Sequence, residues 1–199
     1  PLANTISTLL YGDNYMKIYE NYFASVNFSK RYENGVRFNA SALYEDRIPL
    51  ANTTDFVIFK KSAKNITLNF AYKDTTPYPS VANQAFIVSF DISIKPGQRY
   101  IQYPNRKMSL GSNYPTFSLS YAKGIPNVFG SDVNFDKWRF SISDDKNFKL
   151  AGLLKYKVGI GGFLNTKKVF IQDYQHFNGN RTLRASEYVN SFQLARYYD

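Results

Sequence analysis

The chain is dominated by stretches in which apolar and polar residues alternate one by one. This period of two is typical of β-strands whose two faces meet different surroundings. Two such stretches, residues 23–30 and 36–45, flank Asn34-Gly35. This dipeptide favours a tight turn because both residues tolerate positive φ. The sequence therefore predicts a β-hairpin at this point.

The same alternation recurs along the chain and predicts about eight strands in all. Several are about 9–12 residues long, whereas globular strands average five or six and a tilted membrane strand needs about 9–11. Many aromatic residues lie toward predicted strand ends, as an interfacial girdle requires. The further strands are expected within residues 66–73, 86–95, 117–121, 137–142, 148–160 and 188–197. The aromatic residues are Tyr22, Phe23, Tyr44, Tyr72, Phe86, Phe117, Tyr121, Trp138, Tyr188 and Tyr197.

Alternation alone does not say what each face meets. In a membrane barrel the apolar face meets lipid and the polar face lines a wet lumen, whereas in a soluble sandwich the apolar face is the core. Strand length favours the barrel. We therefore expect an all-β fold, an antiparallel transmembrane β-barrel, with residues 1–199 as one segment of a larger barrel. The sandwich alternative predicts burial between two sheets of Phe86, Val88, Phe90, Leu150, Leu154 and Val158.

The predicted connections are uneven in length. Asn34-Gly35 and residues 144–146 read as tight turns, while residues 47–64, 96–114 and 162–187 read as long loops rich in Gly, Pro, Asn and Lys. Barrels have short turns on one side and long loops on the other. In this strand count the short turns and long loops do not alternate strictly along the chain. The Gly-rich residues 159–162 predict a strand that tapers into a loop or closely approaches a neighbouring backbone.

Composition narrows the class of protein. The chain has 17 Tyr, 17 Phe, no Cys and a formal net charge of +10, so disulfides and thiolate metal sites are excluded. The basic residues are spread out rather than clustered on a helix or a zinc finger, which favours an anionic envelope surface over nucleic acid. A transmembrane helix is not expected, because no run of 18 apolar residues exists. The first residues lack the features of a signal peptide, so we expect further chain upstream.

Candidate chemistry is sparse. His176 is the one histidine, and a hydrolase would need it beside a nucleophile such as Ser186 and an acid such as Asp173. A loop histidine is the simpler interpretation, so no catalytic residue, metal or cofactor is predicted. The carboxylates of Asp132, Asp136, Asp144 and Asp145 lack calcium-loop spacing and are expected to be solvated turn residues.

A basic, aromatic stretch is a second candidate site. It could stack on bases or sugars, but an ordered loop anchored by its tyrosines is favoured. Its candidate binding residues are Arg99, Tyr100, Tyr103 and Arg106.

Six loop motifs resemble one family, at residues 11–19, 96–107, 111–117, 130–133, 161–165 and 173–180. The group is the Bacteroidota outer-membrane proteins of unknown function that carry a carboxypeptidase-regulatory-like N-terminal domain. The resemblance implies an outer-membrane barrel whose periplasmic domain and final strands lie outside this chain. It implies no catalytic residues and no peptidase activity.

A second resemblance links residues 177–184 to the lumen-inserted loop of the BamA-like translocase superfamily. It implies that Arg184 enters the lumen and pairs with a carboxylate of the barrel wall. Ala185-Ser186 departs from that pattern, in which Gly and an aromatic residue follow the Arg. The candidate functional loop is His176, Phe177, Asn178, Gly179, Asn180, Arg181 and Arg184.

The expected function is a non-enzymatic structural, transport or assembly component of the bacterial outer membrane. Its expected partners are outer-membrane lipid, lipopolysaccharide and other outer-membrane proteins or lipoproteins, without nucleic acid. Three alternatives stay open: a BamA-like translocase or insertase, a barrel hydrolase that uses His176, and a soluble carbohydrate-binding β-sandwich.

Overall fold

The computed structural model describes residues 2–12, 18–53, 56–58 and 81–174. Within them the fold is mostly antiparallel β-sheet, with one α-helix, α1 (Leu2–Tyr11), before the first strand. No helix among these residues is long and apolar enough to cross a membrane. The strands expected within residues 66–73 and 188–197 lie outside the described residues.

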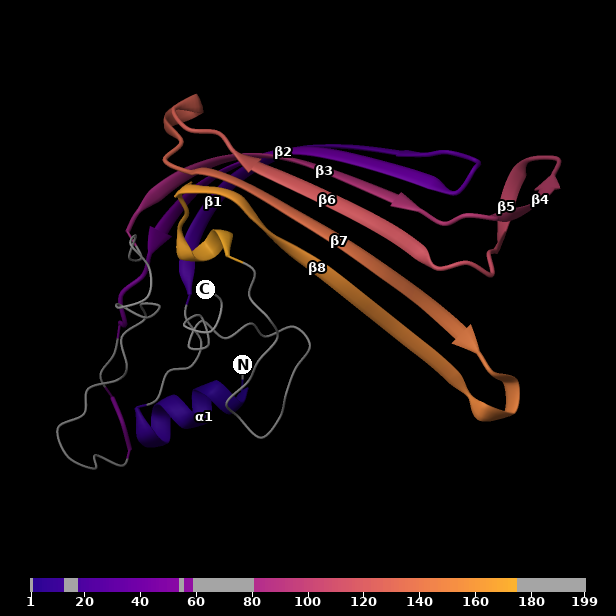
Figure 1. Ribbon diagram of the computed structural model, residues 1–199. Helices are drawn as coiled ribbons and strands as arrows, with labels where there is room; N and C mark the ends of the chain where they lie inside the picture. Colours follow the sequence, from indigo (N-terminus) through magenta and orange to yellow (C-terminus); the bar gives the residue numbers. More distant parts are fainter. Residues whose placement is uncertain (1, 13–17, 54–55, 59–80, 175–199) are drawn as a thin grey trace. The chain divides into compact units, whose positions relative to one another are not determined.

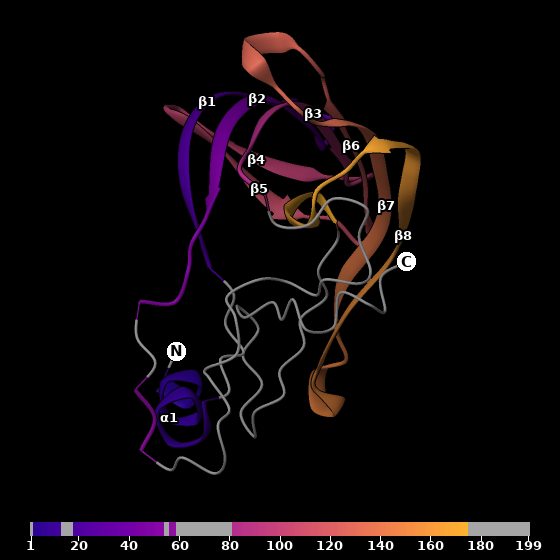
Figure 2. The ribbon, with the colours of Figure 1, turned by 90° about the vertical axis from the view of Figure 1, so that its left-hand side faces the viewer.

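Six strands form one sheet in the order β1-β2-β3-β6-β7-β8, which both views of the ribbon show (Figures 1 and 2). The remaining two strands, β4 (Arg99–Tyr103) and β5 (Arg106–Gly111), pair only with each other. Their hairpin lies beyond the end of β3 and the start of β6 (Figure 1). The strands of the large sheet are β1 (Tyr19–Arg31), β2 (Val36–Pro49), β3 (Asn83–Ile94), β6 (Thr116–Gly124), β7 (Asn134–Asn147) and β8 (Leu153–Lys168).

The strands predicted at residues 23–30, 36–45, 86–95, 117–121 and 137–142 are confirmed, most of them with longer bounds. The predicted strand at 148–160 is misplaced. Phe148 donates its N–H to the carbonyl of Gly152, which has φ +96°, so these residues form the β7–β8 turn. The tight turn expected at 144–146 lies inside β7, and residues 162–168 of the loop expected at 162–187 belong to β8.

The predicted Asn34-Gly35 hairpin is present, with a different turn. Tyr32 donates its N–H to the Val36 carbonyl, which leaves three residues in the loop. Only Gly35 has positive φ, at +84°, whereas a two-residue type I′ turn needs positive φ at both residues. A Cβ on Gly35 would collide with the carbonyl oxygen of Lys95. Glycine is therefore required for both conformation and space.

Gly159 and Gly161 of β8 lie close to the backbone of β7, as one of the two predictions for this stretch proposed. A Cβ on Gly161 would lie 2.6 Å from the carbonyl oxygen of Trp138, inside van der Waals contact. The glycine is needed because the two backbones approach at this point. The strand does not taper into a loop here, since it continues to Lys168.

The described chain forms two compact units. Unit 1 contains residues 1–22, 45–84 and 168–199, and unit 2 contains residues 23–44 and 85–167. In unit 1, the buried apolar residues include Val57, Val169 and Phe170. In unit 2, Val133 and Phe135 are fully buried, and the Phe135 ring packs against Gly124 and Phe163.

The β3–β6–β7 register of unit 2 separates two faces. One face, here called the apolar face, has rows of directly opposite residues: Ile94–Phe117–Ile142, Ile92–Leu119–Phe140 and Phe90–Tyr121–Trp138. The other, the polar face, has the intervening rows Ser93–Ser118–Ser141, Asp91–Ser120–Arg139 and Ser89–Ala122–Lys137. Phe28, Phe38 and Phe90 extend the apolar face across β1 and β2 through ring contacts of 6.4 Å.

Candidate functional site

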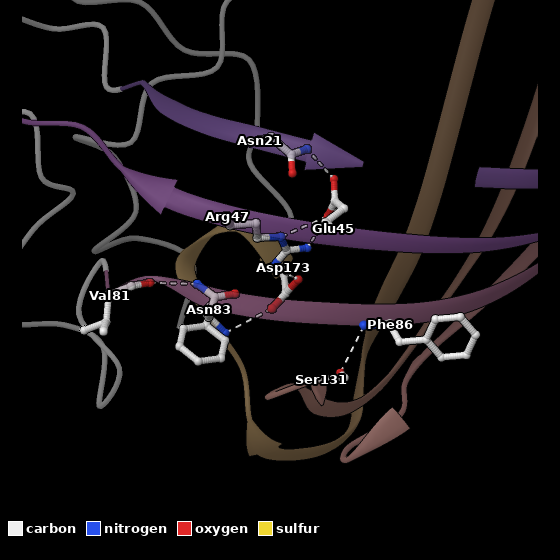
Figure 3. Close-up of polar contacts among 9 residues, drawn as sticks. Asn21, Glu45, Arg47, Val81, Asn83, Phe86, Ser131 and Asp173 are labelled. Carbon is white, nitrogen blue, oxygen red and sulfur yellow. Dashed lines mark hydrogen bonds and ion pairs between the residues drawn. The ribbon is translucent and has the colours of Figure 1, made fainter. Parts of the chain in front are cut away.

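A buried charge cluster lies where β2 meets the segment that follows β8 (Figure 3). The Arg47 guanidinium donates to Asp173 Oδ1 through Nη1 at 2.8 Å and to Glu45 Oε2 through Nη2 at 2.6 Å. Only 3% of the Arg47 side chain and 1% of the Asp173 side chain are exposed. All three residues belong to unit 1. Charged side chains this deeply buried are tolerated only because their opposite charges compensate one another.

Local sequence explains why the cluster forms. Glu45 and Arg47 are two residues apart on β2, so both side chains point to the same face of the strand. Asn21 on β1 donates from Nδ2 to Glu45 Oε1 at 2.8 Å, which fixes the carboxylate from the other side. Glu45 therefore uses one oxygen for Arg47 and the other for Asn21.

Asp173 ends a short 3-10 turn, η3 (Ile171–Asp173), just after β8. Its second carboxylate oxygen, Oδ2, accepts the Phe170 N–H at 3.1 Å, and its own N–H donates to the Phe170 carbonyl. The same side chain thus folds the turn locally and holds it on Arg47. In sheet order, β3, β6 and β7 stand between β2 and β8, so this pair links segments that strand pairing does not join.

Three buried amide oxygens lie in unit 1 and accept no hydrogen bond within the part of the chain that the structure describes: Asn21 Oδ1, Asn83 Oδ1 and Gln172 Oε1. The Asn21 and Asn83 amide orientations are set by their NH₂ groups, which donate to Glu45 and to the Val81 carbonyl. Rotating either amide would place oxygen against oxygen. A buried acceptor without a hydrogen bond costs free energy in a dry core.

The side chains of this cluster are suited to holding the chain in position. Arg47 is fully engaged by two carboxylates and cannot lose its proton, which makes it unsuited to acid–base catalysis. Among the described residues, no three His, Cys, Asp or Glu side chains lie close enough together to hold a metal ion. The cluster is suited to anchoring the chain that leaves β8.

The predicted loop His176, Phe177, Asn178, Gly179, Asn180, Arg181 and Arg184 lies outside the described residues, as does Ser186. Asp173, named only as a partner for His176, is instead engaged by Arg47. Sequence reasoning missed Glu45 and Arg47. Their spacing of two on one strand was visible, but the partner lies 126 residues away along the chain.

The other predicted site, with Arg99, Tyr100, Tyr103 and Arg106, lies in the β4–β5 hairpin. Tyr103 pairs with Arg106 in the register, and Arg99 and Tyr103 are exposed. Lys107 lies 5.3 Å from the centre of the Tyr100 ring and pairs with Glu33 of the β1–β2 turn at 2.6 Å. One side of the hairpin is thereby held to that turn.

The predicted solvated turn carboxylates are partly wrong. Asp136 lies within β7 and accepts hydrogen bonds from Tyr121 Oη and Lys123 Nζ, both at 2.7 Å. Asp144 also lies in β7, is buried, and pairs with Lys146 at 3.1 Å. Both carboxylates are strand residues with cationic partners, so neither is a free turn ligand.

A model described as the C-terminal domain of a family of unknown function, DUF5686, matches residues 1–199. No curated protein and no solved structure matches the chain. These comparisons assign no activity to any residue of the cluster.

Proposed function

Because the chain belongs to the family of the DUF5686 C-terminal domain, whose function is unknown, its surface chemistry has to indicate its role, and we propose that it forms part of the wall of a bacterial outer-membrane β-barrel. In this proposal the apolar face meets lipid and the polar face lines an aqueous lumen. The role is structural, in transport or in outer-membrane assembly, and not enzymatic.

The observation that carries the proposal is the exposure pattern of β3. Phe90, Ile92 and Ile94 are 43%, 38% and 41% exposed, whereas Asp91 and Ser93 between them are half-buried. Soluble sheets bury the apolar side of this alternation. A membrane strand exposes it to hydrocarbon instead.

Side chains on other strands support the same reading. Leu119, Leu154 and Val158 are exposed at 48%, 51% and 67%. Ser141, on the polar face, is buried. Phe90, Leu154 and Val158 are among the residues that a soluble sandwich would bury between two sheets.

The lengths of the strands and the hydrogen bonding of buried polar atoms also support the proposal. Five strands of the large sheet have 12–16 residues, enough to cross a bilayer at a tilt, for which about 9–11 suffice. The buried oxygens of Asn21, Asn83 and Gln172, which accept no hydrogen bond from the described residues, suit a water-filled interior better than a dry core. The Arg47–Asp173 pair would hold the segment after β8 inside that interior.

The single tryptophan of the chain tests the proposal without substitution. Trp138 lies on the apolar face between Tyr121 and β8, so refolding into vesicles of brominated phosphatidylcholine should quench its fluorescence strongly. A matched control carries Trp138→Phe and Ser118→Trp, which moves the tryptophan to the polar face. That variant should be quenched by acrylamide from the water and hardly by bromolipid. A fully folded protein whose Trp138 ignores bromolipid would contradict a membrane role.

The expected partners follow from this placement: outer-membrane lipid and lipopolysaccharide at the apolar face, and other outer-membrane proteins or lipoproteins at the barrel's ends. The BamA-like role of Arg184 and the hydrolase role of His176 depend on residues outside the described part of the chain. Both remain alternatives to this proposal.

A further inference from the structure

The connection between β6 and β7 holds an unusual backbone. It contains the short 3-10 turn η1 (Val128–Gly130), in which Phe129 has φ 50° and ψ 32°, after Asn127 with φ 63°. Asparagine adopts this left-handed region fairly readily, but phenylalanine does so rarely and at a cost in free energy. Strain of this kind persists where the surrounding structure holds it and often marks a functional position.

The surrounding hydrogen bonds fix the loop from both ends. Phe86 of β3 donates its backbone N–H to Ser131 Oγ at 3.0 Å, which Figure 3 shows. The Phe86 carbonyl accepts the Ile125 N–H at 2.9 Å. Within the loop, Asn127 donates its N–H to the Ser131 carbonyl at 2.8 Å. The connection is therefore built onto β3, with Phe129 at its tip.

The Phe129 ring lies on the apolar side of the sheet. It makes edge-on contacts with Phe86 at 5.5 Å and with Tyr44 at 6.4 Å between ring centres. Phe86 and Tyr44 alternate in phase with Phe90 and Phe38, whose rings stack on the apolar face. Despite these contacts, Phe129 is 73% exposed.

Charged and amphipathic groups meet the apolar face at this end. The row after Phe90–Tyr121–Trp138 is Val88–Lys123–Asp136. Tyr121 turns its hydroxyl to Asp136, and Lys123 pairs with the same carboxylate. Aromatic residues mixed with hydrogen-bonded charges are typical of the headgroup level of a bilayer, where one end of a side chain is apolar and the other wet.

We propose that Phe129 is a membrane-interface anchor: the strained η1 loop presses its ring into the lipid headgroup boundary beside the Lys123–Asp136 pair. This inference rests on the proposed barrel wall and adds a residue that fixes where the membrane surface crosses the sheet. The partner is the phospholipid interface, because the surrounding groups combine apolar rings with the Lys123–Asp136 ion pair, whose opposite charges cancel.

The test compares the depth of two tryptophans in the Trp138→Phe background. One variant has Phe129→Trp, and the reference has Ile92→Trp, in the middle of the apolar rows. Each is refolded into vesicles of phosphatidylcholine brominated near the headgroup or near the chain end. We expect Phe129→Trp to be quenched more by the shallow bromines and Ile92→Trp more by the deep ones.

The outcomes separate the two proposals. If Ile92→Trp is quenched by bromolipid but Phe129→Trp is quenched by neither lipid, or mainly by the deep one, the anchor is wrong and the barrel wall stands. If neither variant responds to bromolipid, the barrel wall itself fails. Ser131→Ala in the Phe129→Trp variant gives a second readout, because loss of the Ser131–Phe86 bond should broaden the depth preference if the loop positions the ring.

Discussion

The Arg47 guanidinium and the Asp173 carboxylate form a buried ion pair, with Nη1 and Oδ1 2.8 Å apart, although 126 residues separate them in the chain. Glu45 accepts from the same guanidinium at 2.6 Å. One arginine thereby joins β2 to the segment after β8.

Removing that arginine should destabilise the protein strongly. Arg47→Ala leaves Glu45 and Asp173 as buried carboxylates without a cation, and breaking such a group typically costs about 3–5 kcal/mol. Asp173→Asn should cost less, because Arg47 retains Glu45. Urea unfolding in lipid vesicles measures both. The matched control is Lys107→Ala, whose exposed pair with Glu33 should contribute no more than about 1 kcal/mol. Equal losses for Arg47→Ala and Lys107→Ala would contradict the anchoring role.

A charge placed on either face of β6 should have opposite consequences. Leu119→Arg puts a guanidinium among the apolar rows and should destabilise a membrane-embedded sheet by about 2–4 kcal/mol. Ser118→Arg faces Ser93 and Ser141 on the polar side and should be close to neutral. The free energy of unfolding from vesicles gives the comparison. A Leu119→Arg protein as stable as wild type would indicate that this face meets water.

Gly35 and Gly111 provide a pair of glycines with the same backbone and different surroundings. Their φ values are +84° and +89°, but a Cβ would meet the Lys95 carbonyl only at Gly35. Gly111→Ala should cost about 1–2 kcal/mol from conformation alone. Gly35→Ala should cost more and disturb the β1–β2 turn, visible as faster proteolysis there. Equal unfolding free energies for the two variants would show that the turn can move away from Lys95.

Gly124 is a packing position under the Phe135 ring. Its Cβ would lie 2.7 Å from Phe135 Cε1 and 2.8 Å from Val133 Cγ2, and both neighbours are fully buried. Gly124→Ala should therefore destabilise by about 1–3 kcal/mol through overpacking. Gly162→Ala has nothing within 4 Å and serves as the neutral control in the same unfolding assay. A neutral Gly124→Ala would mean that the ring relaxes freely.

Much of the sheet was predictable because alternation is a local signal. The pattern around Phe90 and Ile92 gave the strand and its two faces, and Asn34-Gly35 gave the hairpin. The β7–β8 turn was misplaced because Phe148 and Leu150 continue the apolar rhythm of the strand that follows. The end of β8 was missed because Gly161-Gly162 suggests a break, whereas the close approach of β7 requires glycine at Gly161.

The candidate site was less accessible to prediction. Strand pairing follows chain order except for the β4–β5 insertion, but the contact between Arg47 and Asp173 follows no periodicity. Asp173 was noticed for its neighbour His176, and Arg47 was assigned to a loop. The helix α1 was also missed, since its apolar residues have no alternation to mark them. The sequence pattern did not mark Phe129 as a candidate residue, because the conformation of its loop is set by hydrogen bonds to β3.

The strict alternation of apolar and polar residues in β6 limits which insertions and deletions this sequence can accept during evolution. Inserting one residue between Leu119 and Ser120 would move Tyr121 to the side of the serines and an alanine to the side of the rings, because a shift of one reverses every side chain beyond it. Deletions have the same effect. Insertions and deletions in the paired strands should therefore be tolerated only when they involve an even number of residues. Those with an odd number of residues should occur in the turns at Gly35 and Gly152 or in the β4–β5 insertion.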